Sequence, residues 1–461
     1  MISSQIALST TCKPPALAQM DCQAKLNALL AKMPPHSVAI FSSSPEYPTT
    51  PDVYHPFRQH SNLLALNGFN EPNSALVVCR LSGKRERCLI MFVQPKDRAA
   101  EVWTGIRCGV DGAKKSFLAS EAFAIDQLET ELPKLLAQAK TVFYRFGVNT
   151  EFDETFRKLW APSQKTLSNP DEILSELRLI KSEPELALMQ TACDISAAAH
   201  VAAMKMTRPG LYEYHLQAQI EYQFRINGNA TPSYGTIVAG GNNAVVLHYV
   251  ANNDELADGD LVLVDAGCEY GGYASDITRT WPVSGNFTEP QRQIYQLVLN
   301  AEKAAIKAVR PGTTLGHVNK VACDILRRGL QKLGILPKAT KAPLKSKKET
   351  TNSSAPLCLD DFFMHGLSHW MGRDVHDVGR HRLETPSGRK GRHRTLEPGM
   401  AFTIEPGLYF DRDDMRIPPR YRGIGVRIED DVVVTADGHK VLTNGVVKEI
   451  ADIEATMRGQ S

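Results

Sequence analysis

The chain has 461 residues, of which 43% are hydrophobic and 23% charged, and 53 Lys and Arg stand against 51 Asp and Glu, giving a net charge of +2. A balance so close to neutral indicates neither a nucleic-acid groove nor a membrane-binding face, and we expect no apolar run long enough to cross a bilayer. Because the chain is too long for one hydrophobic core, two domains are expected.

The thiols and the N-terminus favour a cytoplasmic protein. Nine cysteines are an odd number, and none of them form a Cys-x-x-Cys pair, so reduced thiols are expected. Residues 1–5 contain no basic side chain ahead of a weakly apolar stretch, and a signal peptide is therefore not predicted.

Residues up to about 170 mix helical segments with strand-like runs at 75–79 and 88–93, a pattern typical of an α/β domain. The Asn-Pro step at 169–170 marks the boundary, which gives predicted domains of 1–172 and 173–461. Beyond it, Ser-Glu-Pro-Glu at 182–185 reads as a capping box that opens a helix, and Thr-Glu-Pro-Gln at 288–291 repeats that signal.

The second half of the chain carries a set of residues that could hold two metal ions. Four carboxylates and one imidazole are costly to bury together unless cations neutralise them. Oxygen ligands with a single histidine and no thiolate suit Mn²⁺ or a similar divalent ion better than a structural zinc. The five candidate ligands are Asp265, Asp276, His369, Glu405 and Glu429.

The first two candidate ligands flank a predicted hairpin. The apolar run 261–264 before Asp265 predicts a buried strand, and the Gly-Gly step at 271–272 lies near the midpoint between Asp265 and Asp276. In a symmetric hairpin the two aspartates would lie directly opposite each other, on one face and close enough to share a cation.

A second hairpin is predicted between Glu405 and Glu429. Its midpoint is Ile417, inside the Pro-containing stretch 416–420, which is a plausible loop. Arg427 lies two residues before Glu429 and therefore on the same strand face, where it could support a carboxylate ligand.

An internal repeat connects the hairpins. Residues 258–267 and 398–407 share the order of a Gly-containing turn, an apolar strand and an acidic residue followed two positions later by glycine. Arg-Pro-Gly occurs between two helical segments at 208–210 and again at 310–312. Duplicated halves of this kind predict a pseudo-twofold axis with the dinuclear site at its centre.

Two further segments depart from the pattern of a compact core. Residues 338–356 are rich in Lys, Ala, Thr, Ser, Asn and Pro, which predicts a polar and partly disordered surface loop. Residues 380–394 are strongly basic and are interpreted as a solvated loop, with attraction of acidic peptide ends as the weaker alternative.

Several motifs together resemble bacterial aminopeptidase P, the Xaa-Pro aminopeptidase of the pita-bread metallopeptidases. In the second half these are residues 247–249, 258–270, 365–370, 374–379 and 405–409. Residues 57–62, 68–72 and 100–103 resemble the N-terminal domain of that family. The resemblance implies an α/β creatinase-like N-terminal domain followed by an α+β pita-bread catalytic domain with pseudo-twofold symmetry.

The resemblance also implies a reaction and a ligand set. Members hydrolyse the Xaa-Pro bond at the free N-terminus of a peptide and use two Mn²⁺ ions to activate a water. Asp276 and Glu429 would bridge the ions, Asp265 would complete one, and His369 with Glu405 would complete the other. Glu405 would also carry the proton.

Residues around the metals are assigned by the same resemblance. His248 and His376 would stabilise the carbonyl and the tetrahedral intermediate, His365 would contact the proline side, and Arg427 would orient the carboxylate ligands. Trp103 would line the substrate cleft of a neighbouring subunit in a homotetramer, although ordinary packing would also explain it. The expected partners are peptides with proline in the second position.

Three other interpretations remain. A prolidase would share the metal ligands but accept only dipeptides. Creatinase-type chemistry uses this fold without metals, and a non-catalytic binding protein on this fold would typically have lost ligands. Both are disfavoured because all five ligands are present.

Overall fold

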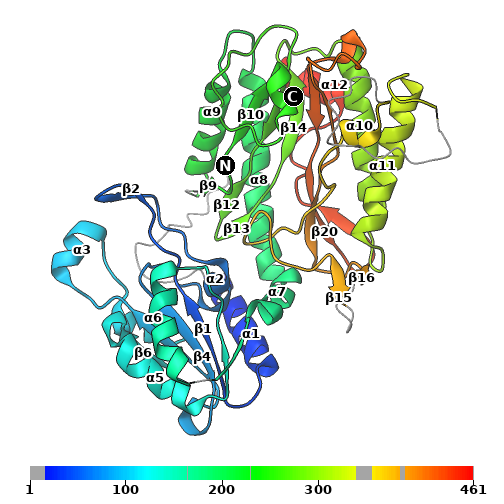
Figure 1. Ribbon diagram of the computed structural model, residues 1–461. Helices are drawn as coiled ribbons and strands as arrows, with labels where there is room; N and C mark the ends of the chain where they lie inside the picture. Colours follow the sequence, from blue (N-terminus) through cyan, green and yellow to red (C-terminus); the bar gives the residue numbers. More distant parts are fainter. Residues whose placement is uncertain (1–15, 164, 229, 339–355, 385–389, 460–461) are drawn as a thin grey trace. The chain divides into compact units, whose positions relative to one another are not determined.

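The computed structural model describes residues 16–163, 165–228, 230–338, 356–384 and 390–459. The chain divides into two compact units, Met1–Arg178 and Leu179–Ser461 (Figure 1). The N-terminal residues 1–5 and nearly all of the predicted polar loop at 338–356 lie outside the described residues.

A six-stranded mixed sheet with the strand order β6-β5-β4-β1-β7-β8 forms the centre of the first unit. The strands of this unit are β1 (Ser37–Ser42), β2 (Pro48–Thr50), β3 (Val53–Tyr54), β4 (Ala75–Arg80), β5 (Cys88–Val93), β6 (Glu121–Ala124), β7 (Thr141–Phe143) and β8 (Thr166–Ser168). Its helices are α1 (Ala16–Lys32), α2 (Ser61–Asn67), α3 (Arg98–Thr104), α4 (Gly109–Ser116), α5 (Leu128–Gln138), α6 (Thr150–Trp160) and α7 (Asp171–Leu179), with 3₁₀ turns η1 (Gly83–Arg85), η2 (Ile125–Gln127) and η3 (Ala161–Ser163).

Helices cover both faces of this sheet, as the sequence of its central strand requires. In β1, Ala39 and Phe41 pack into one apolar cluster with residues of α1, α2 and α4, whereas Val38 and Ile40 pack into another with α5 and α6. Side chains alternate between faces along a strand, so a strand with four consecutive apolar residues, as at 38–41, must be buried on both faces. The strands predicted at 75–79 and 88–93 are confirmed as β4 and β5.

The second unit combines two long helix pairs with short antiparallel strands that lie between them (Figure 1). Its helices are α8 (Glu183–Met206), α9 (Glu213–Ile226), α10 (Glu289–Lys307), α11 (Leu315–Lys332) and α12 (Ile450–Met457), with 3₁₀ turns η4 (Gly241–Val245), η5 (Leu359–Asp361) and η6 (Pro419–Tyr421). Its strands are β9 (Thr231–Pro232), β10 (Ile237–Gly240), β11 (Leu261–Asp265), β12 (Cys268–Tyr270), β13 (Tyr273–Ala274), β14 (Thr278–Pro282), β15 (Arg382–Glu384), β16 (Lys390–His393), β17 (Ala401–Ile404), β18 (Gly407–Phe410), β19 (Ile424–Arg427), β20 (Asp430–Val434) and β21 (His439–Val441).

Both predicted helix starts are confirmed. At the start of α8 the Glu185 carboxylate accepts from the Ser182 amide at 2.9 Å, and at the start of α10 the Gln291 side chain accepts from the Thr288 amide at 2.9 Å. These bonds satisfy amides that have no partner within the helix.

The internal repeat is visible in the backbone. Gly210 and Gly312, which end the two Arg-Pro-Gly steps, have φ of 83° and 84°, a conformation that favours glycine. Gly210 donates its amide to the Leu256 carbonyl at 3.0 Å, and Gly312 donates to Leu396 at 2.9 Å. Each half therefore fastens the loop between its helices to the segment before its metal-site strand in the same way.

Two expectations about this unit are wrong. One helix, α8, passes the length and composition test for a membrane span, with a mean hydropathy of 1.2 over its best 18 residues, because Ala and Met occupy much of it. It packs as a core helix, with Ala192, Ala199 and Ala203 fully buried.

In the basic stretch 380–394, β15 and β16 pair as antiparallel strands where a loop was expected, since their backbone groups bond to each other.

Candidate metal centre

The first hairpin forms as predicted, but its register differs from the expected one by two residues. Asp265 faces Thr278 across the ladder of β11 and β14, so direct opposition to Asp276 is wrong. The turn consists of Gly271 and Gly272, with φ of 59° and 77°, and therefore lies one residue beyond the assumed centre. A two-residue shift preserves the face of every side chain, so both aspartates remain on one side.

The second hairpin confirms the predicted opposition of Glu405 and Glu429. In the ladder between β17 and β20, Ile404 faces Asp430, and in that between β18 and β19, Gly407 faces Arg427. The two ladders share the same register, so Glu405 and Glu429, which lie in the gap between the two ladders, face each other.

Backbone hydrogen bonds also place His369 beside the second hairpin and join the two hairpins to each other. The segment before the second hairpin runs along β17, where Thr403 donates its amide to the His369 carbonyl at 3.0 Å and Glu405 donates to Leu367 at 2.9 Å. Glu429 donates its amide to the carbonyl of Thr278 at 3.0 Å, so a strand of the second hairpin lies beside a strand of the first.

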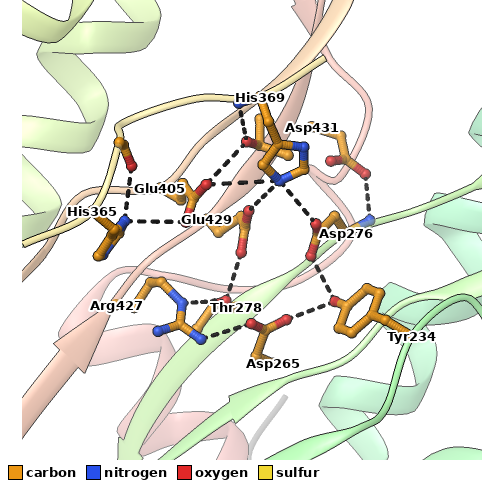
Figure 2. Close-up of polar contacts among 12 residues, drawn as sticks. Tyr234, Asp265, Asp276, Thr278, His365, His369, Glu405, Arg427, Glu429 and Asp431 are labelled. Carbon is orange, nitrogen blue, oxygen red and sulfur yellow. Dashed lines mark hydrogen bonds and ion pairs between the residues drawn. The ribbon is translucent and has the colours of Figure 1, made fainter. Parts of the chain in front are cut away.

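The structure brings all five candidate ligands into one pocket, where three of the carboxylates face the imidazole of His369 (Figure 2). Its Nε2 lies 3.4 Å from Oδ2 of Asp276, 3.7 Å from Oε1 of Glu405 and 4.0 Å from Oε1 of Glu429. One donor atom each from Asp276, His369 and Glu429 fall within 4.8 Å of one another, a spacing that could hold a metal ion. Asp265 and Glu405 lie outside this tightest group and line the same pocket.

Arg427 is the cation among these acids, and it contacts Asp265 directly. Nη2 of Arg427 donates to Oδ2 of Asp265 at 2.6 Å, and its Nε donates to the Thr278 hydroxyl at 3.0 Å. That hydroxyl in turn donates to Oε2 of Glu429 at 2.6 Å. Arg427 therefore contacts Asp265 directly and Glu429 through the hydroxyl of Thr278.

Three hydroxyl side chains at the site were not predicted. Tyr234 lies 2.6 Å from Oδ1 of both Asp265 and Asp276, and its one proton can serve only one of them at a time. Thr278 and Tyr409 could have been found from the alternation of strand side chains, since they follow Asp276 by two residues and Glu405 by four. No local signal marks Tyr234.

Three histidines that are not predicted ligands line the same pocket of about 560 Å³. The ring of His376 lies 4.2 Å from that of His369, centroid to centroid, in an edge arrangement. His365 lies 2.8 Å from the Tyr409 hydroxyl through Nε2 and 3.5 Å from Glu405 through Nδ1. His248 is exposed and lies on the loop after η4.

Trp103 is not among the residues that line this pocket. It lies on α3 in the first unit with 87% of its surface exposed, and the residues that line the pocket all belong to the second unit. Its predicted contact with the substrate of a neighbouring subunit stays a prediction.

The pKa shifts of Glu429, Glu405 and His369 are those expected of a site that binds cations. Burial, followed by the charges of Asp276 and Glu405, raises the pKa of Glu429 well above its ordinary value, and burial also raises the pKa of Glu405 to about 7. Burial lowers the pKa of His369, but its carboxylate neighbours, Asp276 first, outweigh that effect and bring it to about 9. Four carboxylates share one guanidinium here, so they need further positive charge, as divalent cations would provide.

The oxygen-rich donor set also fits such ions chemically. Carboxylate oxygens with one imidazole suit Mn²⁺ and related divalent metals. Cys268, three residues after Asp265, is buried with Sγ 3.4 Å from the Ala192 carbonyl, and burial raises its pKa to about 11. It is a structural thiol and adds no ligand to the site.

Comparisons with known proteins agree with this geometry. The sequence profile of metallopeptidase family M24 matches residues 187–436, and that of the aminopeptidase P N-terminal domain matches residues 22–144. The Xaa-Pro aminopeptidase of Escherichia coli is 40% identical over 96% of this chain and 98% of its own length. The expected fold class, an α/β domain followed by a pita-bread domain, is confirmed.

Solved structures show the same similarity. Aminopeptidase PepP of Pseudomonas aeruginosa superposes with a TM-score of 0.87 at 40% identity, covering 98% of this chain and 99% of its own. Zinc-substituted Escherichia coli aminopeptidase P in complex with product gives a TM-score of 0.86 at 39% identity, covering 96% and 99% of the two chains.

Proposed function

The chain belongs to metallopeptidase family M24, and we propose that it removes the N-terminal residue from peptides that carry proline in the second position. The observation that carries this proposal is the convergence of five candidate metal ligands and three further histidines in one pocket. Near-full-length similarity to proteins named Xaa-Pro aminopeptidase supports it.

We propose that Asp265, Asp276, His369, Glu405 and Glu429 hold two Mn²⁺ ions. Such a pair would polarise the scissile carbonyl and make hydroxide available from water near neutral pH. Tyr234 and Arg427 hold the Asp265 carboxylate from two sides, at 2.6 Å each, which would fix its direction before any ligand binds. The free amine of the peptide would bind on the Asp265 side of the pocket.

The remaining side chains would bind the peptide and move protons. Glu405 would accept a proton from the attacking water and pass it to the proline nitrogen as the bond breaks. His248 and His376 would donate hydrogen bonds to the carbonyl oxygen as negative charge develops on it, and His365 would lie on the proline side. Arg427 would keep Asp265 and, through Thr278, Glu429 in place.

We further propose a cytoplasmic homotetramer in which Trp103 lines the cleft of a neighbouring subunit. The N-terminal domain would comprise residues 1–172 and the catalytic domain 173–461. Exposure of Trp103 and of its neighbour Val102, at 87% and 76%, is compatible with a contact between subunits. Sedimentation of the purified protein would give the number of chains, and Trp103→Ala would lower peptide affinity if the contact forms.

Matched peptides test the proposed reaction. A proline nitrogen carries no hydrogen in a peptide bond, so a site shaped for its ring leaves no place for the N–H of another residue. Xaa-Pro-Yaa should be cleaved far faster than Xaa-Ala-Yaa, and acetylation of the amine should block cleavage. Equal kcat/KM for proline and alanine would refute the specificity.

The same assay separates the alternatives. Cleavage of Xaa-Pro dipeptides together with refusal of tripeptides and longer chains would identify a prolidase. Binding of peptides without hydrolysis by the metal-loaded protein would identify a non-catalytic relative. Activity that survives thorough chelation would favour the metal-free chemistry of creatinase.

A further inference from the structure

We infer that Glu213 is a positioning residue that clamps the segment 240–254 and thereby holds His248 in the substrate pocket. The inference rests on the proposed function, because the contact of His248 with substrate is part of it. Glu213 touches neither the pocket nor any candidate metal ligand in the contacts described below, and it would act only through the segment.

Four hydrogen bonds converge on the Glu213 carboxylate. Oε1 accepts from the Gly240 amide at 2.8 Å and from Nδ2 of Asn243 at 3.0 Å. Oε2 accepts from the Tyr249 hydroxyl at 2.8 Å and from the Asp254 amide at 3.0 Å. Both oxygens are therefore fully used, and the side chain is completely buried at the first position of α9.

The places of these donors along the chain make the contact a clamp. Gly240 is the last residue of β10, and Asp254 lies shortly before β11, so the two amides mark the two ends of one excursion from the sheet. The Asp254 carbonyl also accepts from the Glu213 amide at 2.9 Å. One carboxylate thus joins the two ends of the loop, which a bond from Nδ2 of Asn243 to Oδ2 of Asp254 at 2.7 Å also connects.

The third donor fixes the part of the loop that matters for the pocket. Tyr249 directly follows His248, and consecutive Cα atoms are about 3.8 Å apart, so an anchored Tyr249 limits where the His248 backbone can lie. His248 is exposed, and an exposed loop side chain has no packing of its own to hold it. The anchor must come from its neighbours.

The four partners of the clamp are neutral donors: two backbone amides, one carboxamide and one hydroxyl. Burial, followed by the bond to Glu213, raises the pKa of Tyr249 to about 12, so the hydroxyl remains a donor across the working range of a peptidase. The Tyr249 side of the contact therefore keeps its donor across that range.

A second anchor on the same helix supports this reading. Gln217, one turn after Glu213 on α9, accepts from Nδ2 of Asn252 at 2.8 Å, and the Asn252 side chain also bonds to the backbone of Thr236 and Val238. Asn252 has φ of 48° and is 1% exposed. The start of α9 thus carries two polar side chains that face the loop.

The test uses Tyr249→Phe, which keeps the ring and removes the bond to Glu213, and Glu213→Gln, which leaves a carboxamide facing the Asp254 amide. Both variants should keep full metal content. Turnover of an Xaa-Pro-Yaa peptide should fall in kcat by about tenfold for Tyr249→Phe and further for Glu213→Gln, because transition-state contacts are lost. Hydrogen exchange should accelerate within residues 240–254.

A double-variant cycle distinguishes positioning from general destabilisation. If Tyr249 acts through His248, Tyr249→Phe should cause no further loss of kcat in a His248→Ala background. Tyr421→Phe is the matched control: Tyr421 is buried and donates to Gln293 at 2.7 Å elsewhere in the unit, so this variant should lose a similar bond and keep its kcat.

Each outcome decides between the claims. Equal fold losses from Tyr249→Phe in the presence and absence of His248, or unchanged exchange in 240–254, would overturn the clamp. A protein with bound metal that hydrolyses no Xaa-Pro peptide would refute the proposed function, and the exchange rates would still decide whether Glu213 holds the segment. If Glu213→Gln does not fold, the Tyr249→Phe variant and its double-variant cycle with His248→Ala still test the inference.

Discussion

Lys181 and Asp377 form an ion pair in which Nζ and Oδ2 are 3.3 Å apart and both side chains are only 1% exposed. Lys181 lies directly before Ser182, the N-cap of α8, and Asp377 directly follows His376. Asp377 also donates its amide to the Trp370 carbonyl at 2.8 Å. The pair therefore ties the loop that carries one pocket histidine to the start of a core helix.

Breaking this pair should be costly. Lys181→Met removes one buried partner of the Asp377 carboxylate, which should lower the free energy of unfolding by more than about 1 kcal/mol, the upper end for an exposed pair. Adding Asp377→Asn removes the charge that Lys181 neutralised, so the double variant should lose less than the sum of the two single variants. Denaturant unfolding of the metal-loaded protein measures all three.

An exposed ion pair provides the control. Lys303 and Glu449 are 2.7 Å apart with side chains 52% and 47% exposed, and Lys303→Met should change stability by less than about 1 kcal/mol. If both lysine variants gave the same small change, the buried pair would have no special part in holding the loop.

Metal removal should abolish hydrolysis and lower the melting temperature, because the four carboxylates of the site repel one another without cations. Mn²⁺ should restore both properties. Asp276→Asn should bind fewer than two metal ions per chain by elemental analysis. Asp324→Asn, on the surface of α11 and paired with Lys320, serves as the control and should bind the full number. Undiminished activity in chelated protein would contradict the metal centre.

The histidines should separate into a ligand and substrate-facing groups. His376→Ala should lose on the order of 100-fold or more in kcat while it keeps its metal, because a donor to the developing oxyanion is lost. His369→Ala should instead lose metal, since its Nε2 lies among three carboxylates. Equal metal loss in the two variants would show that this division of labour is wrong.

Acid should destabilise the protein partly through His200. Burial on α8 lowers the pKa of this fully buried imidazole from 6.5 to about 4. Between those values the unfolded chain binds a proton that the native protein does not, so stability falls as pH falls through this window and is unaffected by His200 above it. The contribution lost by pH 4 amounts to about 3 kcal/mol.

The variant His200→Gln isolates that contribution. It should be less stable than the unmodified protein at pH 7, but its stability should decline less between pH 6.5 and pH 4. Comparison of the two proteins cancels the acid sensitivity of the metal site, which both share. Parallel stability curves over this range would mean that His200 is protonated in the native state.

The sequence by itself indicated the candidate ligands and determined much of the local structure. Capping boxes at Ser182 and Thr288, the strand before Asp265 and the opposition of Glu405 and Glu429 all depend on residues close in the chain or on a symmetric loop. Such features follow from backbone hydrogen-bonding rules and from the two-residue period of a strand, which operate locally.

Only the tertiary structure decided the register of the first hairpin and the groups that support the site. The turn at Gly271 and Gly272 places Asp265 opposite Thr278. This two-residue shift leaves every side chain on the same face of its strand, so the alternation of apolar and polar residues in the sequence cannot reveal it. Tyr234 at the two aspartates and Lys181 at Asp377 meet residues between 31 and 196 positions away. Contacts over such separations exist only when the whole unit has packed, so no short pattern in the sequence encodes them.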